Sequence, residues 1–195
     1  MGRSMIEQLK RSSKPALLEV FTRAFSDQAF MPSIGRGHET VRAVMKGFLR
    51  FFSRHRSLLL HGIRQDGRLV CGSVAADSTE EPGALSAGLF FVELVRALGW
   101  RTTTEFDTIH KEQPKYDERY LELVLLGALP SCQRQGLGRQ MLQFVCGEAK
   151  RRDYAGVILL TNRAAPAFHL YTKNGFTVDN EFPFLDVKLC WMRHG

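Results

Sequence analysis

The sequence has few of the residues that cross-link small secreted proteins or bind structural metals. It contains only 4 cysteines in 195 residues, and they are scattered without a C-x-x-C pair: Cys71, Cys132, Cys146 and Cys190. This spacing indicates neither a zinc site nor a disulfide framework. No apolar signal segment precedes the cysteines, so we expect a cytoplasmic protein with reduced thiols.

The chain also lacks a long uninterrupted apolar run. Its most apolar stretch, Ala84 to Trp100, is broken by Glu93 and Arg96 and is shorter than the roughly 20 residues that span a bilayer. We therefore expect no membrane segment and interpret this stretch as part of a helical insertion at about residues 84–113. Two roles stay open for the insertion, packing on the core and forming a wall or lid over a pocket.

Motifs of several other enzyme classes are missing. The sequence has no H-E-x-x-H for a catalytic metal and no G-x-S-x-G elbow for a serine nucleophile. It has no internal repeats or long linkers, and its 44% apolar content predicts a single domain over residues 1–195. The net charge of +7 favours anionic ligands, but it requires no nucleic-acid partner, because a small polyanion would also be attracted.

A glycine loop is the most informative feature that the sequence does contain. Residues 133–138 stand between an apolar run, Tyr120 to Pro130, and an amphipathic helix that begins at Leu137. The first N–H groups of a helix have no internal acceptor and lie at the positive end of its dipole, so they can bind an anion. Gly136 and Gly138 allow a sharp turn and a close approach of phosphate. The loop fits neither the dinucleotide fingerprint nor the P-loop, because their further glycine and Gly-Lys-Ser/Thr signatures are missing.

A second motif follows a short, apolar strand at residues 156–161. The stretch Ala167 to Phe176 has the pattern Ala-x-x-Leu-Tyr-x-Lys-x-Gly-Phe. Together with the glycine loop, in this order and spacing, it resembles the GNAT superfamily of acetyl-CoA-dependent N-acetyltransferases, over about Tyr120 to Arg193. The stretch His110 to Pro130 and the ending near Trp191 are most similar to the puromycin-acetyltransferase-like branch.

This resemblance implies a fold and a co-substrate. The implied fold is α/β (α+β), a mixed, mostly antiparallel sheet of about 6–7 strands flanked by helices and splayed at the acetyl-CoA site. Acetyl-CoA is the implied co-substrate, and no metal is implied. By family position, the cofactor contacts would be Leu126, Gly127, Ala128, Gln133, Arg134, Gln135, Gly136, Leu137, Gly138, Arg139, Asn162, Ala167 and Tyr171. An asparagine often found seven residues before the tyrosine is Ala164 here, so a contact by the nearby Asn162 stays open.

Glu122 and Tyr171 are the candidate catalytic residues. An amine with a lysine-like pKa is almost entirely protonated at pH 7, so its acetylation is helped by a base. Glu122 lies eleven residues before Gln133, the offset of the general-base glutamate in histone-acetylating members. Strand alternation places it on one face with every second residue up to Ala128. The resemblance implies that Tyr171 protonates the departing thiolate and that a free main-chain N–H near the strand end stabilises the oxyanion.

Alternatives remain open for the base, the acceptor and the function. Glu118 and Asp117 are weaker candidates for the base, His169 is not expected to take part, and His110 is expected at the surface with an acceptor-site role left open. The branch resemblance favours a primary amine of a small molecule as acceptor, attacked directly through a tetrahedral intermediate. Acetylation of protein lysines or N-termini and a non-catalytic acyl-CoA sensor are the alternatives. Nucleic acid is not expected as a partner, and a homodimer stays open.

Periodicity predicts the remaining elements. Within the second predicted helix, residues 38–55, an apolar stripe runs from Val41 to Phe52, and a basic stripe from Arg42 to Arg54 is interpreted as a solvated face. The segment 101–117 is expected to be a polar connection. The other predicted helices cover residues 15–26, 137–152 and 165–173, and the other predicted strands cover residues 57–63, 68–75 (joined by an Asp66-Gly67 turn), 176–178 and 187–192.

Overall fold

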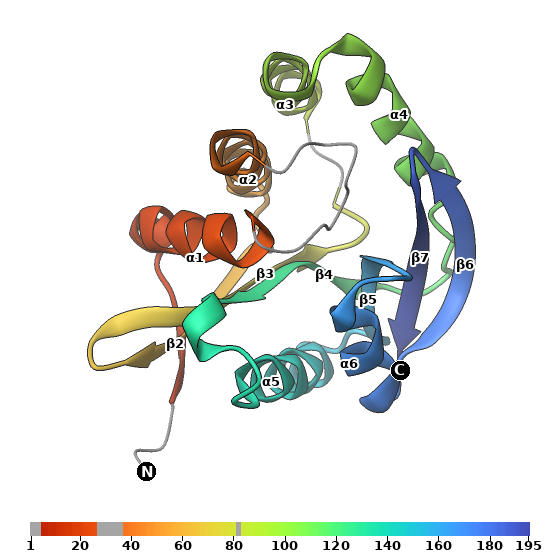
Figure 1. The fold of residues 1–195 in the computed structure, drawn as a ribbon. Coiled ribbons are helices and arrows are strands. Elements are labelled where there is room, and N and C mark those ends of the chain that lie inside the picture. Colours follow the sequence, from red (N-terminus) through yellow and green to blue (C-terminus); the bar gives the residue numbers. More distant parts are fainter. Residues whose placement is uncertain (1–4, 27–36, 81–82) are drawn as a thin grey trace.

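The computed structural model describes residues 5–26, 37–80 and 83–195. At its centre is a curved, open 7-stranded sheet in the order β1-β2-β3-β4-β5-β7-β6 (Figure 1). Strands β4 and β5 run parallel, and the other neighbouring pairs run antiparallel. The predicted mixed, mostly antiparallel α/β fold is therefore confirmed. The strands are β1 (Ile6–Gln8), β2 (Leu59–Gln65), β3 (Arg68–Asp77), β4 (Tyr120–Ala128), β5 (Gly156–Asn162), β6 (Thr177–Phe184) and β7 (Val187–His194).

Helices cover both faces of this sheet. In Figure 1, α1, α2 and α3 lie above it, α5 lies below it, α6 lies beside β5, and α4 reaches the end of β6. These helices are α1 (Lys14–Ser26), α2 (His38–Phe52), α3 (Ala84–Leu98), α4 (Trp100–Lys111), α5 (Leu137–Arg151) and α6 (Pro166–Lys173), with short 3-10 turns η1 (Arg11–Ser13) and η3 (Pro130–Cys132). No helix in the described ranges is long and apolar enough to cross a membrane.

Three elements differ from the sequence prediction, namely β1, which was not predicted, α4 and β6, while the predicted hairpin turn is confirmed. The segment predicted as a polar connection contains helix α4, which buries only Thr103 and therefore shows no apolar periodicity. Strand β6 continues to Phe184, beyond its predicted end at residue 178. The prediction stopped short because Asp179, Asn180 and Pro183 are residue types that strands disfavour. Asp66 and Gly67 have φ angles of 50° and 76° between β2 and β3, as a tight hairpin requires.

Helix α1 packs directly on the middle of the sheet. Gly72 of β3 and Gly127 of β4 are cross-strand partners beneath it. A Cβ at Gly72 would lie 2.4 Å from Leu17 Cδ2, and one at Gly127 would lie 3.1 Å from Phe21 Cδ1. The two glycines therefore form a floor for the fully buried Leu17 and Phe21. Gly127 thus makes room for α1, and its contact with the cofactor stays a prediction.

Strands β4 and β5 are paired only at their beginnings. The paired residues end with Glu122 and Ile158. Beyond them β4 pairs with β3 alone and β5 pairs with β7 alone, so the two strands separate (Figure 1). Val124 has no direct partner in β3, and this bulge bends β4 at the point of separation. The expected splay is present, and it leaves main-chain groups of β4 without a strand partner on the side of β5.

Candidate active site

The loop between β4 and α5 presents main-chain donors. Arg134 and Gly136 have φ angles of 60° and 82°, and Gly136 caps the start of α5. In the part of the chain that the structure describes, the N–H groups of residues 134–139 have no hydrogen-bond acceptor. The series of helical bonds begins with Gln140 N–H to Gly136 O, at 3.0 Å. These donors can therefore hold an anion, and the contact with phosphate itself stays a prediction.

Side chains of the same loop hold it in place. Gln133 Nε2 donates to Ala128 O at 3.1 Å, and Gln135 Nε2 donates to Ser131 O at 3.2 Å. The side chain of Leu137 is buried in the core beneath the start of α5. The loop is thus fixed to the end of β4 by its side chains, and its main chain is left to meet a ligand.

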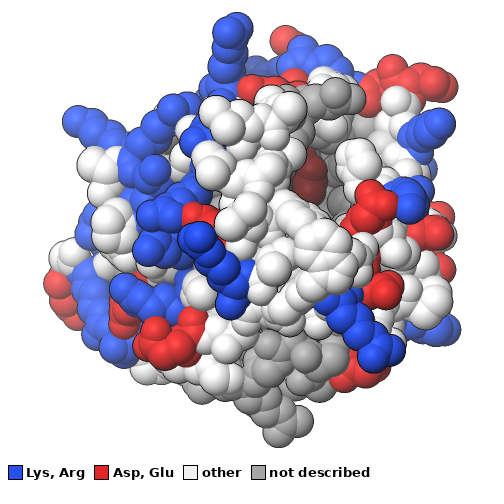
Figure 2. All heavy atoms as spheres, turned by 90° about the horizontal axis from the view of Figure 1, so that it is seen from above, with Lys and Arg blue, Asp and Glu red and all other residues white. Residues whose placement is uncertain are grey.

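A cavity of about 410 Å³ lies above the splay, between β4, α2, α3 and α4. Of the predicted site residues, Glu122, Leu126, Ala167 and Tyr171 line it. Figure 2 shows a hollow on the upper face with an acidic side chain inside and mainly uncharged side chains around it. The structure thus brings together both candidate catalytic residues, which the chain separates by one helix and one strand.

Glu122 stands at the point where β4 and β5 separate. It is the last residue of β4 that pairs with β5, and its half-buried side chain lines the cavity. Across the described ranges no hydrogen bond or ion pair reaches its carboxyl group. Burial raises the pKa of Glu122 to about 7. A carboxyl group with this pKa can accept and return a proton near neutral pH.

Tyr171 faces the cavity from the other side of the splay. It lies on α6, its side chain is 7% exposed, and its ring packs 5.8 Å from that of Phe176. Burial raises the pKa of Tyr171 well above its ordinary value. The phenol therefore stays protonated at neutral pH, which a proton donor requires.

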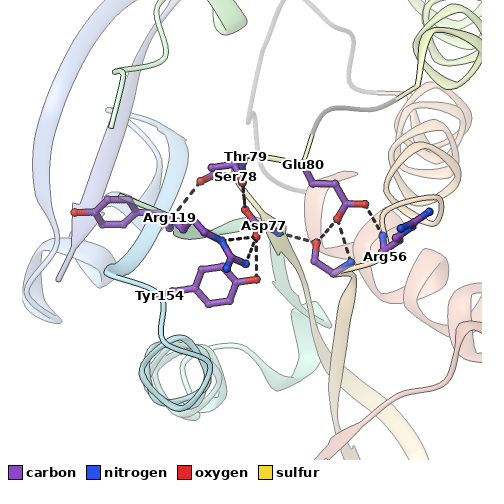
Figure 3. Close-up of polar contacts among 9 residues, drawn as sticks. Arg56, Asp77, Ser78, Thr79, Glu80, Arg119 and Tyr154 are labelled. Atoms are coloured by element: carbon purple, nitrogen blue, oxygen red, sulfur yellow. Dashed lines mark hydrogen bonds and ion pairs between the residues drawn. The ribbon is translucent and has the colours of Figure 1, made fainter. Parts of the chain in front are cut away.

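A polar network borders the cavity where β3 ends and β4 begins (Figure 3). Asp77 Oδ2 accepts hydrogen bonds from Arg119 Nη2 at 2.5 Å and from Tyr154 Oη at 3.4 Å. Glu80 accepts hydrogen bonds from Ser57 Oγ at 2.6 Å and from the Arg56 N–H at 2.6 Å. This network ties the chain after α2 to the ends of both strands.

The network also sets the charge of the two carboxyl groups. Burial favours the neutral form of each group, but hydrogen bonds from Thr79 and Arg119 lower the pKa of Asp77. Hydrogen bonds from Ser57 and Arg56 likewise outweigh burial and lower the pKa of Glu80. Both carboxylates are therefore ionised at neutral pH.

Some predicted residues lie elsewhere or serve other roles. Asn162 is 3% exposed, and its Oδ1 accepts a hydrogen bond from the Ala164 N–H at 2.9 Å, so it shapes the turn before α6. His169 is exposed and lies outside the cavity lining. His110, expected at the surface, is exposed but also lines the cavity. The weaker base candidates, Asp117 and Glu118, are exposed and lie outside the lining.

Sequence reasoning missed most of the cavity wall. Its phenylalanines come from α1, α2, α3 and α4 and are Phe25, Phe48, Phe51, Phe52, Phe90 and Phe106, and Trp191 of β7 joins them. The apolar stripe of α2 was recognised, but periodicity does not tell whether such a stripe faces the core or a cavity. The acidic residues that follow β3 gave no motif, because their place beside β4 is set by strand pairing.

Comparisons with known proteins agree with this geometry. The family description "Acetyltransferase (GNAT) domain" matches residues 101–178. No curated protein sequence matches the chain significantly. Solved structures do match in fold. One is a histone acetyltransferase HPA2 and related acetyltransferase from Corynebacterium glutamicum, with 18% identity, 97% of this chain and 94% of that chain covered, and a TM-score of 0.67.

Two further structures share the fold. The PaiA N-acetyltransferase from Thermoplasma acidophilum, solved with coenzyme A, is 15% identical, with 100% of both chains covered and a TM-score of 0.61. A ribosomal-protein-alanine N-acetyltransferase from Brucella melitensis is 15% identical, with 97% and 98% covered and a TM-score of 0.59. Residues 101–178 thus match a GNAT acetyltransferase domain, and the chain has the fold of GNAT acetyltransferases, splayed sheet included. These findings support an acetyl-CoA-dependent N-acetyltransferase.

Proposed function

We propose that this enzyme transfers the acetyl group of acetyl-CoA directly to a primary amine of a small molecule. The observation that carries the proposal is the position of Glu122 and Tyr171, which line one cavity from the two sides of the splay. A base and an acid on opposite sides of an opening between strands suit a reaction in which one group loses a proton and another gains one.

The cofactor would be held mainly by main chain. The free N–H groups of residues 134–139 suit the diphosphate, and the unpaired edge of β4 from Leu123 onward suits the pantetheine chain. Leu126, Ala167 and Tyr171 line the adjoining cavity and would lie near the thioester. Acetyl-CoA supplies the acyl group that is transferred. An N–H of β4 on the unpaired side would stabilise the oxyanion.

The proton transfers follow from the two side chains. Glu122 takes a proton from the acceptor ammonium, directly or through water, and leaves a neutral amine. The amine nitrogen forms a bond to the carbonyl carbon, and the bond from that carbon to sulfur breaks. The nitrogen gives its second proton to water, and Glu122 passes the first to solvent. Tyr171 gives its proton to the sulfur and regains one from solvent, so that one proton is released overall. No covalent acyl-enzyme is needed.

The setting of the reaction is also part of the proposal. We propose a cytoplasmic enzyme with a small-molecule amine as its partner and no nucleic-acid or membrane partner. The free Cys71 and Cys190 are buried, which is compatible with a reducing compartment. If the basic stripe of α2 bound nucleic acid, the affinity would fall steeply with salt, and this can be tested by titration.

The experiment that tests the proposed function is a thiol-release assay with acetyl-CoA and a panel of small amines. We expect release that depends on the amine, together with an N-acetylated product of added mass 42. Binding of acetyl-CoA without turnover on any amine would contradict the proposal. Equal turnover of small amines and of peptide lysines would contradict the assignment to small molecules.

A further inference from the structure

The wall of the cavity opposite β4 is aromatic. On α2, the rings of Phe51 and Phe52 meet edge to face at 5.0 Å. Phe90 of α3 joins them, with its ring 4.7 Å from Phe51 and 5.2 Å from Phe48. This aromatic wall, Phe48, Phe51, Phe52 and Phe90, is built by the contact of α2 with α3. It offers apolar, flat surfaces to whatever enters the cavity.

The charged residues of the same cavity are acidic. Asp77, Glu80 and Glu122 line it, and the described part of the lining contains no lysine or arginine. Asp77 is paired with Arg119, which lies outside the lining. The carboxylate of Glu80 accepts its hydrogen bonds from neutral donors, namely Ser57 and the main chain of Arg56. The cavity therefore keeps a negative charge although the whole chain carries +7.

The combination of an aromatic wall and carboxylates favours one class of ligand over others in this cavity. A long acyl chain would suit the aromatic wall but would bring no positive charge to the ionised Glu80, which has hydrogen bonds and no salt bridge among the described residues. A polar polyamine would suit the carboxylates but would leave the rings without an apolar partner. An ammonium group on an aromatic body satisfies both parts, because rings attract cations through their faces and also pack against rings.

We propose that the acceptor of this enzyme is a primary amine joined by a short linker to an aromatic or similarly bulky apolar group. Its ring lies against the aromatic wall, and its ammonium group is attracted by Glu80 and loses a proton to Glu122. The inference rests on the proposed acetyl transfer and adds the class of acceptor to it.

Steady-state thiol release tests the class with amines that share the reacting group. The probes are 2-phenylethylamine, ethanolamine and putrescine at saturating acetyl-CoA. Burying a phenyl ring predicts that kcat/KM for 2-phenylethylamine exceeds that for ethanolamine by about tenfold or more. Ethanolamine or putrescine as the equal or better substrate would overturn the inference, although it would leave acetyl transfer intact. No release from any amine would instead contradict the proposed function.

Two variants link the preference to the wall and the charge. Phe51→Leu keeps an apolar side chain and should reduce the preference for 2-phenylethylamine over ethanolamine by about threefold to tenfold. Glu80→Gln should raise KM for 2-phenylethylamine severalfold at low salt. The matched controls are Phe144→Leu on α5 and Glu105→Gln on α4, which lie outside the lining. Preferences that change equally in variants and controls would overturn the assignment.

A second acyl donor tests whether the aromatic wall holds the acceptor or a long acyl chain. If the aromatic wall holds the acceptor, octanoyl-CoA should be a poorer donor than acetyl-CoA, because its chain competes for the same space. A higher kcat/KM with octanoyl-CoA, reduced by Phe51→Leu, would show that the wall holds the acyl chain and would overturn the inference.

Discussion

At the scale of single residues, burial raises the pKa of both Glu122 and Tyr171, but the result is a proton acceptor in one case and a proton donor in the other. It raises the pKa of Glu122 to about 7, so the carboxylate form is available at neutral pH. It also raises the pKa of Tyr171, which was already far above neutrality, so the phenol keeps its proton. One apolar surrounding thus supplies both a proton acceptor and a proton donor.

Removing the carboxylate should slow the reaction and change its pH dependence. We expect Glu122→Gln to lower kcat/KM for the amine by about 10²–10⁴-fold. In the wild type kcat/KM should rise as pH increases through about 7, because Glu122 must be ionised to accept a proton. The control is Glu118→Gln, an exposed carboxyl group outside the lining. An unchanged pH profile in Glu122→Gln would refute the role as base.

The Glu122→Gln substitution should also change the stability of the protein. Whereas kcat/KM of the wild type rises with pH, the stability contributed by its Glu122 carboxyl group falls with pH. A carboxyl group whose pKa is raised on folding binds its proton more tightly in the folded state. Its favourable contribution is therefore present at low pH and is lost as pH rises from 4.5 to about 7. Relative to wild type, Glu122→Gln should gain melting temperature between pH 4.5 and 7. Melting curves that stay parallel across this range would contradict the raised pKa.

The hydroxyl group of Tyr171 should matter for turnover and little for folding. No hydrogen bond to it is found among the described residues, so Tyr171→Phe should leave the melting temperature nearly unchanged. We expect kcat to fall by about 10²-fold or more, with KM for acetyl-CoA nearly constant. Wild-type turnover in this variant would exclude Tyr171 as the general acid.

At the scale of elements, α5 offers two glycines that separate a binding role from a structural one. Gly136 has a φ of 82° at the helix start, whereas Gly147 lies in the exposed middle of the helix with open space around it. Gly136→Ala adds a methyl group and about 1 kcal/mol of strain beside the free N–H groups. It should raise KM for acetyl-CoA about tenfold, because it also impedes the approach of phosphate.

The control substitution, at Gly147, should have the reverse effect on the stability of the protein. Gly147→Ala should stabilise the protein by about 0.5–1 kcal/mol, because alanine favours the helix, and it should leave KM for acetyl-CoA unchanged. Thermal melts and kinetics on the two variants supply both readouts. Equal effects on KM would mean that the loop does not bind the cofactor.

The elements that the sequence predicted well are those defined by local patterns. The helix after the glycine loop has one apolar face, with Met141 and Val145 fully buried, so its period is clear. The turn at Asp66 and Gly67 could be predicted because both residue types tolerate a positive φ. By contrast, α4 has a single buried residue, and strand β1 has only 3 residues, too few for any period.

At the scale of the whole molecule, the candidate site depends on contacts that no local pattern contains. The motifs located the glycine loop and Tyr171, and the offset from Gln133 indicated Glu122. The acceptor side required strand pairing to bring Glu80 beside the cavity and helix packing to bring Phe90 against α2. That Gly127 makes room for α1 could not be predicted, because only the packing of α1 shows what fills the space above it.

The central claim is that the free main-chain N–H groups of residues 134–139 bind the diphosphate of coenzyme A. The most direct measurement is an NMR titration of ¹⁵N-labelled protein with coenzyme A, followed amide by amide. The account predicts saturable shifts and slowed exchange for the amides of residues 134–139, and no change in the turn at Asp66 and Gly67. Absence of saturable shifts in the loop, or shifts confined to other parts of the chain, would contradict it.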